Sequence, residues 1–155
     1  MNNVTLIGMP GSGKSTIGVI LAKALRYEFL DSDLLIQKQE KRKLSEIIEQ
    51  DGPEKFKEIE NQVNADIHVT DTVIAPDGSV IYCDEAMEHL KSIGKVIYLK
   101  LSLESLSKRL GNLKGRGVLR NLYRAELPVK PDRFFNSNSA GAFTAARTTN
   151  ISQFG

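Results

Sequence analysis

The sequence predicts an α/β domain in three layers, with a central parallel sheet between two layers of helices. Short apolar runs at residues 4–7, 28–30, 72–75 and 95–99 are typical of buried strands. Between these runs, apolar residues recur three or four positions apart, as on the buried face of a helix. Strands that alternate with helices form βαβ units, which build a parallel sheet covered on both faces. The length of 155 residues fits one such domain.

Composition excludes several classes of protein. The formal net charge of +2 is too small to indicate nucleic acid or an anionic membrane as a partner. No apolar run approaches the roughly 20 residues of a membrane span, and the first residues lack the pattern of a secretory signal. We therefore expect a cytoplasmic protein. We also expect it to be a monomer. Cys83 is the only cysteine, and we expect it to be a small buried residue rather than a nucleophile.

The first two helices are predicted from their apolar spacing and their opening residues. Apolar side chains recur at helical spacing from Ile17 to Leu25, directly after a glycine-rich turn. The next helix opens with residues 34–36, and Ser32 or Asp33 is placed to cap it. Both helices therefore follow a strand at the same edge of the sheet.

Proline and glycine punctuate the helices that follow. Pro53 is placed in the first turn of a third helix. Residues 84–93 form a fourth helix, which Gly94 ends, and Ser102 is placed to cap a fifth. The stripe of the third helix that should face the core comprises Phe56, Ile59, Val63 and Ile67.

The end of the chain has a different composition. Residues 131–155 contain one acid, one branched aliphatic residue and four of the six phenylalanines. We find no strand or closing helix there, because neither a period of 3.6 nor one of 2 is sustained. We therefore expect a domain at residues 1–130 and, for the most part, a poorly ordered tail after it. The alternative is that the phenylalanines cover an exposed edge of the sheet.

Residues 8–16 predict a site for the phosphates of a nucleotide. They carry the pattern G-x-x-x-x-G-K-[ST] between a strand and a helix. The glycines let the backbone wrap closely, so that its N–H groups point at phosphate oxygens, while Lys14 reaches the β- and γ-phosphates and Ser15 ligates Mg²⁺. We therefore predict that the chain binds ATP with Mg²⁺, the alternative being a glycine-rich turn with an incidental lysine. The expected contacts are Gly11, Ser12, Gly13, Lys14, Ser15 and Thr16.

Two carboxylates are predicted beside this loop. Asp31 and Asp33 follow the second strand, at the carboxyl edge of the sheet, where ligands of such folds bind. A phosphotransferase needs a carboxylate to orient the acceptor hydroxyl or take its proton, and another can hold water on Mg²⁺. The alternative is that one of the two only caps a helix.

Three segments, residues 8–18, 29–33 and 52–60, resemble shikimate kinases in their order and spacing. The resemblance covers about residues 1–130. It implies a P-loop NTPase fold like that of nucleoside-monophosphate kinases. It also implies transfer of the γ-phosphate of ATP to a hydroxyl of shikimate, a small-molecule substrate of aromatic amino acid biosynthesis.

The resemblance also implies roles for individual residues. Asp33 would contact the acceptor hydroxyl and act as the base, and Asp31 would lie in the water shell of Mg²⁺. A lid around residues 109–120 would be mobile, with Arg116 closing on the phosphates. Arg109 would lie against the adenine.

The chain departs from the family pattern on the acceptor side. Lys57 stands where the family has an arginine, so one mobile charge replaces a forked donor for a carboxylate. Asp77 stands beside Gly78 in a turn where the family has glycines, and its charge would repel an anionic acceptor. A second arginine, expected near Glu126, is absent. The resemblance therefore places Lys57, Asp77 and Gly78 at the acceptor but predicts weakened activity.

These departures leave other interpretations open. Lys57 and Glu60 could form a surface ion pair, and Asp77 could be an ordinary turn residue that points away from the site. The acceptor could be another small hydroxylated molecule, such as a sugar acid or a nucleotide. The chain could also be a nucleotide-binding relative that has lost catalysis, although the intact loop and Asp33 argue against this.

Overall fold

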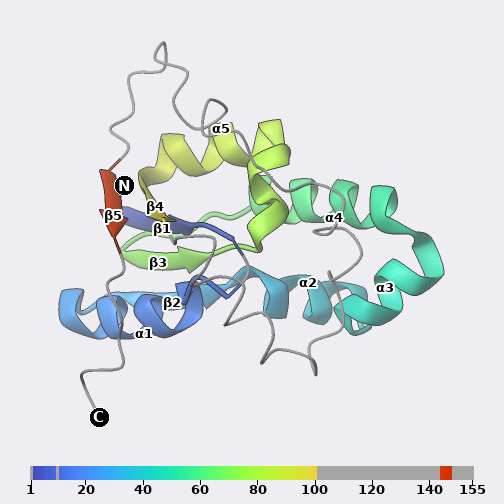
Figure 1. Ribbon diagram of the computed structural model, residues 1–155, viewed down its shortest axis with the longest axis horizontal. Helices are drawn as coiled ribbons and strands as arrows, with labels where there is room; N and C mark the ends of the chain where they lie inside the picture. Colours follow the sequence, from blue (N-terminus) through green and yellow to red (C-terminus); the bar gives the residue numbers. More distant parts are fainter. Residues whose placement is uncertain (1, 10, 101–143, 148–155) are drawn as a thin grey trace.

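The structure is a computed structural model, and it describes residues 2–9, 11–100 and 144–147. Figure 1 shows a twisted sheet with α1 on one side and α5 on the other. The strand order is β2-β3-β1-β4-β5, and every pair of neighbours is parallel. The predicted three-layer α/β architecture is therefore confirmed. The strands are β1 (Asn3–Ile7), β2 (Glu28–Asp31), β3 (Thr72–Ala75), β4 (Gly94–Lys100) and β5 (Thr144–Arg147).

Two helices, at residues 44–51 and 78–82, were not predicted, and the others lie close to where apolar spacing predicts them. The helix at residues 84–93 has the predicted bounds, and the third predicted helix begins at Pro53 as expected. A helix after Ser102 lies outside the described residues. The helices are α1 (Lys14–Leu25), α2 (Ser32–Glu40), α3 (Leu44–Asp51), α4 (Pro53–Ala65), the short 3₁₀ helix η1 (Gly78–Tyr82) and α5 (Asp84–Ile93).

Both faces of the sheet are buried, as the apolar strands require. Successive residues of a strand point to opposite faces, so β1, β2, β3 and β4 each supply side chains to two clusters. The cluster toward α1 contains Leu6, Val73 and Leu99 with Ala22. The cluster toward α5 contains Ile7, Ile74 and Val96 with Ala86 and Leu90.

One strand lies where none was expected. β5 pairs with β4 from Ile97 opposite Thr144 to Lys100 opposite Arg147. Its sequence, Thr-Ala-Ala-Arg, carries no apolar run and no alternation, so only its pairing with the edge of β4 marks it as a strand. The expectation of no strand within residues 131–155 was wrong, while the division into a domain at 1–130 and a tail stays a prediction.

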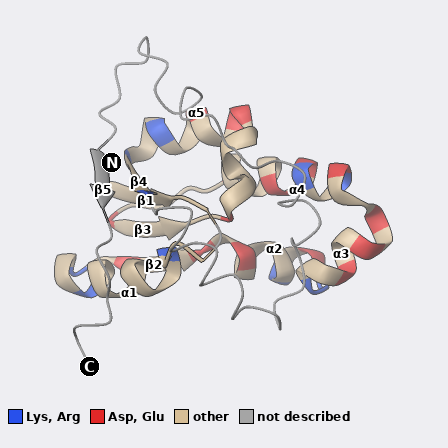
Figure 2. Ribbon diagram, in the orientation of Figure 1, with Lys and Arg blue, Asp and Glu red and all other residues tan. Residues whose placement is uncertain are grey.

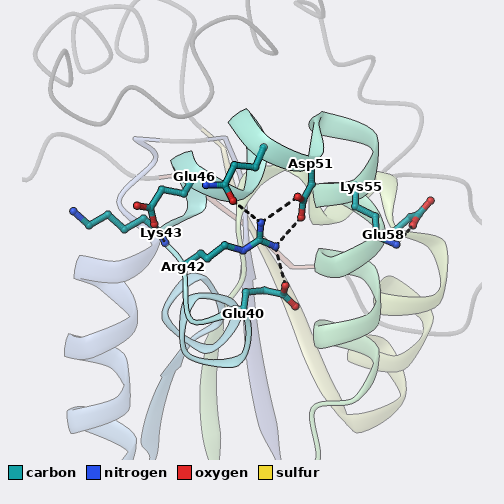
Figure 3. Close-up of polar contacts among 8 residues, drawn as sticks. Glu40, Arg42, Lys43, Glu46, Asp51, Lys55 and Glu58 are labelled. Atoms are coloured by element: carbon teal, nitrogen blue, oxygen red, sulfur yellow. Dashed lines mark hydrogen bonds and ion pairs between the residues drawn. The ribbon is translucent and has the colours of Figure 1, made fainter.

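A third apolar cluster joins α2, α3 and α4, and a charged cluster ties α2 to α3. The apolar cluster comprises Ile36, Ile47, Phe56 and Val63. Arg42, in the turn between α2 and α3, donates from Nη2 to Glu40 Oε2 at 3.2 Å and to Asp51 Oδ2 at 2.7 Å (Figure 3). This hydrogen bond from Arg42 lowers the pKa of Asp51. Figure 2 shows acidic residues along α3 and charges of both signs along α4. Together these contacts fix the helices that carry the residues described below.

Asn3 ties the beginnings of three strands together. Its Nδ2 donates to the carbonyls of Val69, at 2.8 Å, and Ile93, at 3.1 Å, while its Oδ1 accepts from Thr72 N at 3.1 Å. The side chain is buried with both its groups bonded. Among the described residues, no helix has the length and apolarity to cross a membrane.

Replacing Asn3 by alanine should destabilise the fold by about 2–4 kcal/mol, because two buried backbone groups and one partly buried one lose their partner. Urea unfolding at pH 7 measures this. Asn2→Ala is the matched control, since that side chain is exposed one residue earlier. An Asn3→Ala midpoint equal to that of the control would contradict the assigned role.

Candidate functional site

The loop between β1 and α1 has the backbone geometry of an anion cradle. Gly11 and Gly13 have φ angles of 75° and 89°, in the left-handed region that favours glycine. Ser12 N donates to Met9 O at 3.0 Å, which closes the turn, and Gly13 occupies the N-cap position of α1. No described side chain caps this helix. Its first N–H groups and its positive dipole end are therefore available to a phosphate.

Lys14 lies folded back on the loop that carries it. Its Nζ donates to the carbonyls of Gly8, at 2.8 Å, and Met9, at 3.1 Å. Burial lowers the pKa of Lys14, and the charges of Asp77, Asp33, Glu60 and Asp31 oppose that shift. To reach a phosphate the ammonium must exchange two carbonyl oxygens for phosphate oxygens, which requires only rotation of a flexible side chain.

Other groups of the loop fit a nucleotide with its metal. Ser12 is 1% exposed, and its hydroxyl has no hydrogen-bond partner among the described residues. A phosphate oxygen would supply the missing acceptor. Ser15 and Thr16 are exposed at the start of α1, so their hydroxyls can reach a ligand. The described residues contain no group of three or more His, Cys, Asp or Glu side chains that could hold a metal ion.

Asp31 and Asp33 lie beside this loop at the carboxyl edge of the sheet. β3 lies between β2 and β1, and Asp31 pairs with Ala75 at the last position of that ladder. Asp31 Oδ1 accepts from Asp33 N at 2.9 Å and from Leu34 N at 3.4 Å. The expectation that Ser32 or Asp33 caps α2 was therefore wrong. Asp31 is the cap because its side chain precedes the helix, which leaves Asp33 in the first turn.

Glu60 is buried, which the sequence-based interpretation missed. Its side chain is 0% exposed, and Ser79 Oγ donates to its Oε2 at 2.5 Å. The alternative of a surface ion pair with Lys57 was wrong, because Lys57 is exposed and its Nζ lies 6.0 Å from the ring centroid of Tyr82. Burial, reinforced by the charge of Asp77, raises the pKa of Glu60 to about 8.

Asp77 points into the protein rather than away from it. It is 8% exposed, and its Oδ1 accepts from Gly78 N at 2.7 Å, which caps η1. The alternative of an outward-facing turn residue was wrong, because the carboxylate serves as the cap of a buried helical turn. Burial raises the pKa of Asp77, and the nearby ammonium of Lys14 opposes this.

Cys83 behaves as the sequence predicts. It is buried in the cluster under α5. Burial raises the pKa of its thiol to about 12, and the charge of Glu60 contributes to the same shift. A thiol with this pKa is protonated at neutral pH and is a poor nucleophile.

The structure brings most of the predicted residues to one place. Lys14 is surrounded by Asp31, Asp33, Glu60 and Asp77, all within range of its charge. Arg109, Arg116, the region near Glu126 and the lid at 109–120 lie outside the described residues. Their roles stay predictions.

The sequence-based analysis did not place Glu60 or its hydrogen-bond partner Ser79 near Lys14. The spacing offered a signal for Glu60, because it lies four residues after Phe56 and three before Val63, on the apolar stripe of α4. An acid on such a stripe is expected to be buried. No comparable signal marks Ser79, whose position depends on how η1 packs against α4.

Comparisons with known proteins agree with this geometry. The family model for shikimate kinase matches residues 10–144. A shikimate kinase of Microcystis aeruginosa is 39% identical over 77% of this chain and 63% of its own length. One of Azobacteroides pseudotrichonymphae is 32% identical over 97% of this chain and 94% of its own length. The chain spans less than two thirds of the Microcystis relative.

Solved structures give the same result. Shikimate kinase from Acinetobacter baumannii, in complex with shikimate, aligns with a TM-score of 0.82 at 28% identity over 97% of this chain and 85% of that one. The enzyme from Aquifex aeolicus aligns with a TM-score of 0.66 at 31% identity over 77% and 71% of the two chains. A gluconokinase from Sinorhizobium meliloti, at 17% identity and a TM-score of 0.54, shares the fold. The chain therefore belongs to the shikimate kinase family.

Proposed function

We propose that this protein transfers the γ-phosphate of ATP to a hydroxyl of shikimate. The observation that carries the proposal is the placement of Lys14 and Asp33 at one edge of the sheet, in a chain of the shikimate kinase family. Lys14 and the uncapped start of α1 supply positive charge for the phosphates. Asp33 supplies a carboxylate on the side from which an acceptor would approach.

Each group has a defined part in the reaction. The N–H groups of the loop and Lys14 hold the β- and γ-phosphates, and Ser15 with Asp31, through water, holds Mg²⁺, which neutralises phosphate charge. Asp33 orients the acceptor hydroxyl and accepts its proton. The acceptor oxygen forms a bond to the γ-phosphorus as the bond from phosphorus to the β–γ bridging oxygen breaks, so that ADP leaves with that oxygen. The roles of Arg116, closing on the phosphates, and Arg109, against adenine, complete the proposal.

The acceptor side should bind weakly. Lys57 replaces an arginine, and the arginine expected near Glu126 is absent. Loss of a charge-assisted hydrogen bond costs about 1.5–3 kcal/mol, which is roughly 10- to 150-fold in affinity for each contact. Because all the proposed groups belong to one chain and ATP is the donor, we propose that the protein acts as a monomer in the cytoplasm.

A coupled assay that measures ADP release tests the proposal. With saturating ATP and Mg²⁺, addition of millimolar shikimate should stimulate ADP release above the rate without acceptor. The same preparation carrying Lys14→Ala sets the background. Shikimate that fails to raise the rate above this background would refute the proposal.

Asp77 favours a second candidate, a kinase for a different small hydroxylated acceptor. A carboxylate in the turn after β3 suits an acceptor that offers hydroxyl groups rather than a negative charge. A panel of sugars, sugar acids and nucleosides in the same assay distinguishes the two, because only the true acceptor should stimulate ADP release. ATP binding by calorimetry, with no transfer to any member of the panel, would instead indicate a nucleotide-binding relative without catalysis.

A further inference from the structure

Glu60, Ser79 and Asp77 form a row of three side chains beside Lys14, in which the two acids are buried and Ser79 is partly buried. Ser79 Oγ lies 2.5 Å from Glu60 Oε2 and 3.4 Å from Asp77 Oδ2. The two acids come from different elements, Glu60 from α4 and Asp77 from the loop between β3 and η1. Neither carboxyl has a basic side chain within 4.0 Å among the described residues. The row therefore joins two acids through one hydroxyl.

One hydroxyl cannot satisfy two ionised carboxylates. Ser79 has a single hydrogen, and the shorter distance assigns it to Glu60. If Asp77 is then ionised, its Oδ2 faces the lone pairs of the Ser79 oxygen, which is repulsive. If one carboxyl carries a proton, the row becomes a chain of two hydrogen bonds with every hydrogen used. The geometry therefore favours one proton held among the three side chains.

The charges around the row support the same conclusion. The ammonium of Lys14 acts on both acids, and its Nζ already donates to two loop carbonyls. Glu60 Oε1 is buried with no hydrogen-bond partner among the described residues, which is costly for an ionised oxygen. Burial raises the pKa of Glu60 to about 8 and also raises that of Asp77. Among the described residues, the other titratable groups that face the row are Asp31, Asp33, Cys83 and, through Cys83, Lys57.

We propose that Glu60 and Asp77 share one proton through Ser79 at neutral pH, and that this proton lets the acceptor side of the candidate site bind an anion. Asp77 is then a specificity-determining residue, since it sets the charge that the acceptor meets. The inference rests on the proposed function, because the carboxylate of shikimate supplies the anion. Loss of the proton at higher pH adds a negative charge and weakens binding of the anion.

The shared proton can be tested without any ligand. Carbon-13 NMR of labelled carboxyl groups follows each acid through a pH titration. In the wild type, one of the two carboxyl carbons should keep the chemical shift of the protonated form at pH 7. Asp77→Asn should shift the Glu60 titration to lower pH, because a neighbouring charge is removed. Two carboxyls that are both ionised at pH 6 would overturn the proposal.

The consequence for the acceptor is tested by calorimetry with shikimate in the presence of ADP. The wild-type Kd should rise roughly tenfold from pH 7 to pH 9, as expected for one proton with a pKa between these values. Asp77→Asn should reduce this rise to less than twofold. Asp71→Asn is the matched control and should follow the wild type. This substitution removes the same charge at an exposed position, directly before the first residue of β3. Asparagine tolerates the φ of 49° that Asp71 adopts.

The outcomes separate the two proposals. A wild-type Kd that does not change with pH would overturn the role of the proton in acceptor binding, and so would a change that Asp77→Asn leaves intact. If shikimate does not bind to the wild type or to Asp77→Asn at any pH, the proposed acceptor is wrong. The NMR titration then still decides whether the proton is shared. Circular dichroism of each variant shows whether it is folded.

Discussion

Replacing Lys14 by alanine should lower the rate of phosphoryl transfer by roughly 100- to 1,000-fold, the usual cost of removing a positioned donor to developing charge. Its ammonium is the positive side chain of the anion cradle, and it lies 2.8 Å from the Gly8 carbonyl. Burial already lowers the pKa of Lys14, so its charge is costly to keep within the protein. Its removal should therefore affect turnover far more than stability.

The measurement compares kcat and thermal midpoint for three proteins. Lys23→Ala is the matched control, because Lys23 is an exposed lysine in the last turn of the same helix. We expect the control to keep both wild-type values and Lys14→Ala to keep only the thermal midpoint. If Lys14→Ala retains a tenth or more of wild-type turnover, the ammonium of Lys14 does not take part in phosphoryl transfer.

Replacing Glu60 by glutamine should change how stability depends on pH. The folded chain raises the pKa of Glu60 from 4.5 to about 8. Between pH 4.5 and about pH 8, Glu60 is protonated in more of the folded molecules than of the unfolded ones. The free energy of unfolding therefore falls as the pH rises through this range. From pH 4 to pH 9 the wild type should lose on the order of 4 kcal/mol through this group. Glutamine has no charge to bury, and it can still accept from Ser79, so the variant should be more stable than the wild type at pH 9.

Urea unfolding at pH 5, 7 and 9 measures the effect as a difference between wild type and variant, which cancels the titration of other groups. Glu58→Gln is the control, since Glu58 lies on the same helix, is exposed and pairs with Lys55 at 2.8 Å. Its profile should run parallel to that of the wild type. A parallel profile for Glu60→Gln would show that Glu60 ionises normally in the folded protein.

Local signals predicted most of the fold. The bounds of β3 and α5 follow from a β-branched run and from an apolar period that ends at Gly94. β5 could not be predicted, because Thr144–Arg147 becomes a strand only by pairing with β4. α3 was missed although Leu44, Ile47 and Ile48 have helical spacing. Its short length and many charges hid the pattern.

The candidate site was predictable on one side only. The motif G-x-x-x-x-G-K-[ST] predicted the phosphate-binding loop around Lys14. The topology of a parallel sheet predicted that Asp31 and Asp33 lie beside this loop. The directions of Asp77 and Glu60 depend on how η1 packs against α4. A turn of the form Pro-Asp-Gly is compatible with an exposed or a buried aspartate, so tertiary packing decides between them.

The burial of Cys83 makes its thiol a probe of motion beside Glu60. The thiol lies 3.9 Å from Glu60 Oε2 and just before α5, and its high pKa keeps it unreactive while the fold is closed. A thiol reagent can therefore modify it only when this segment opens transiently. Because the chain has no other cysteine, the labelling rate reports the opening of this one region. A bound nucleotide or acceptor that steadies the region would slow the labelling, which gives a readout of occupancy that needs no turnover.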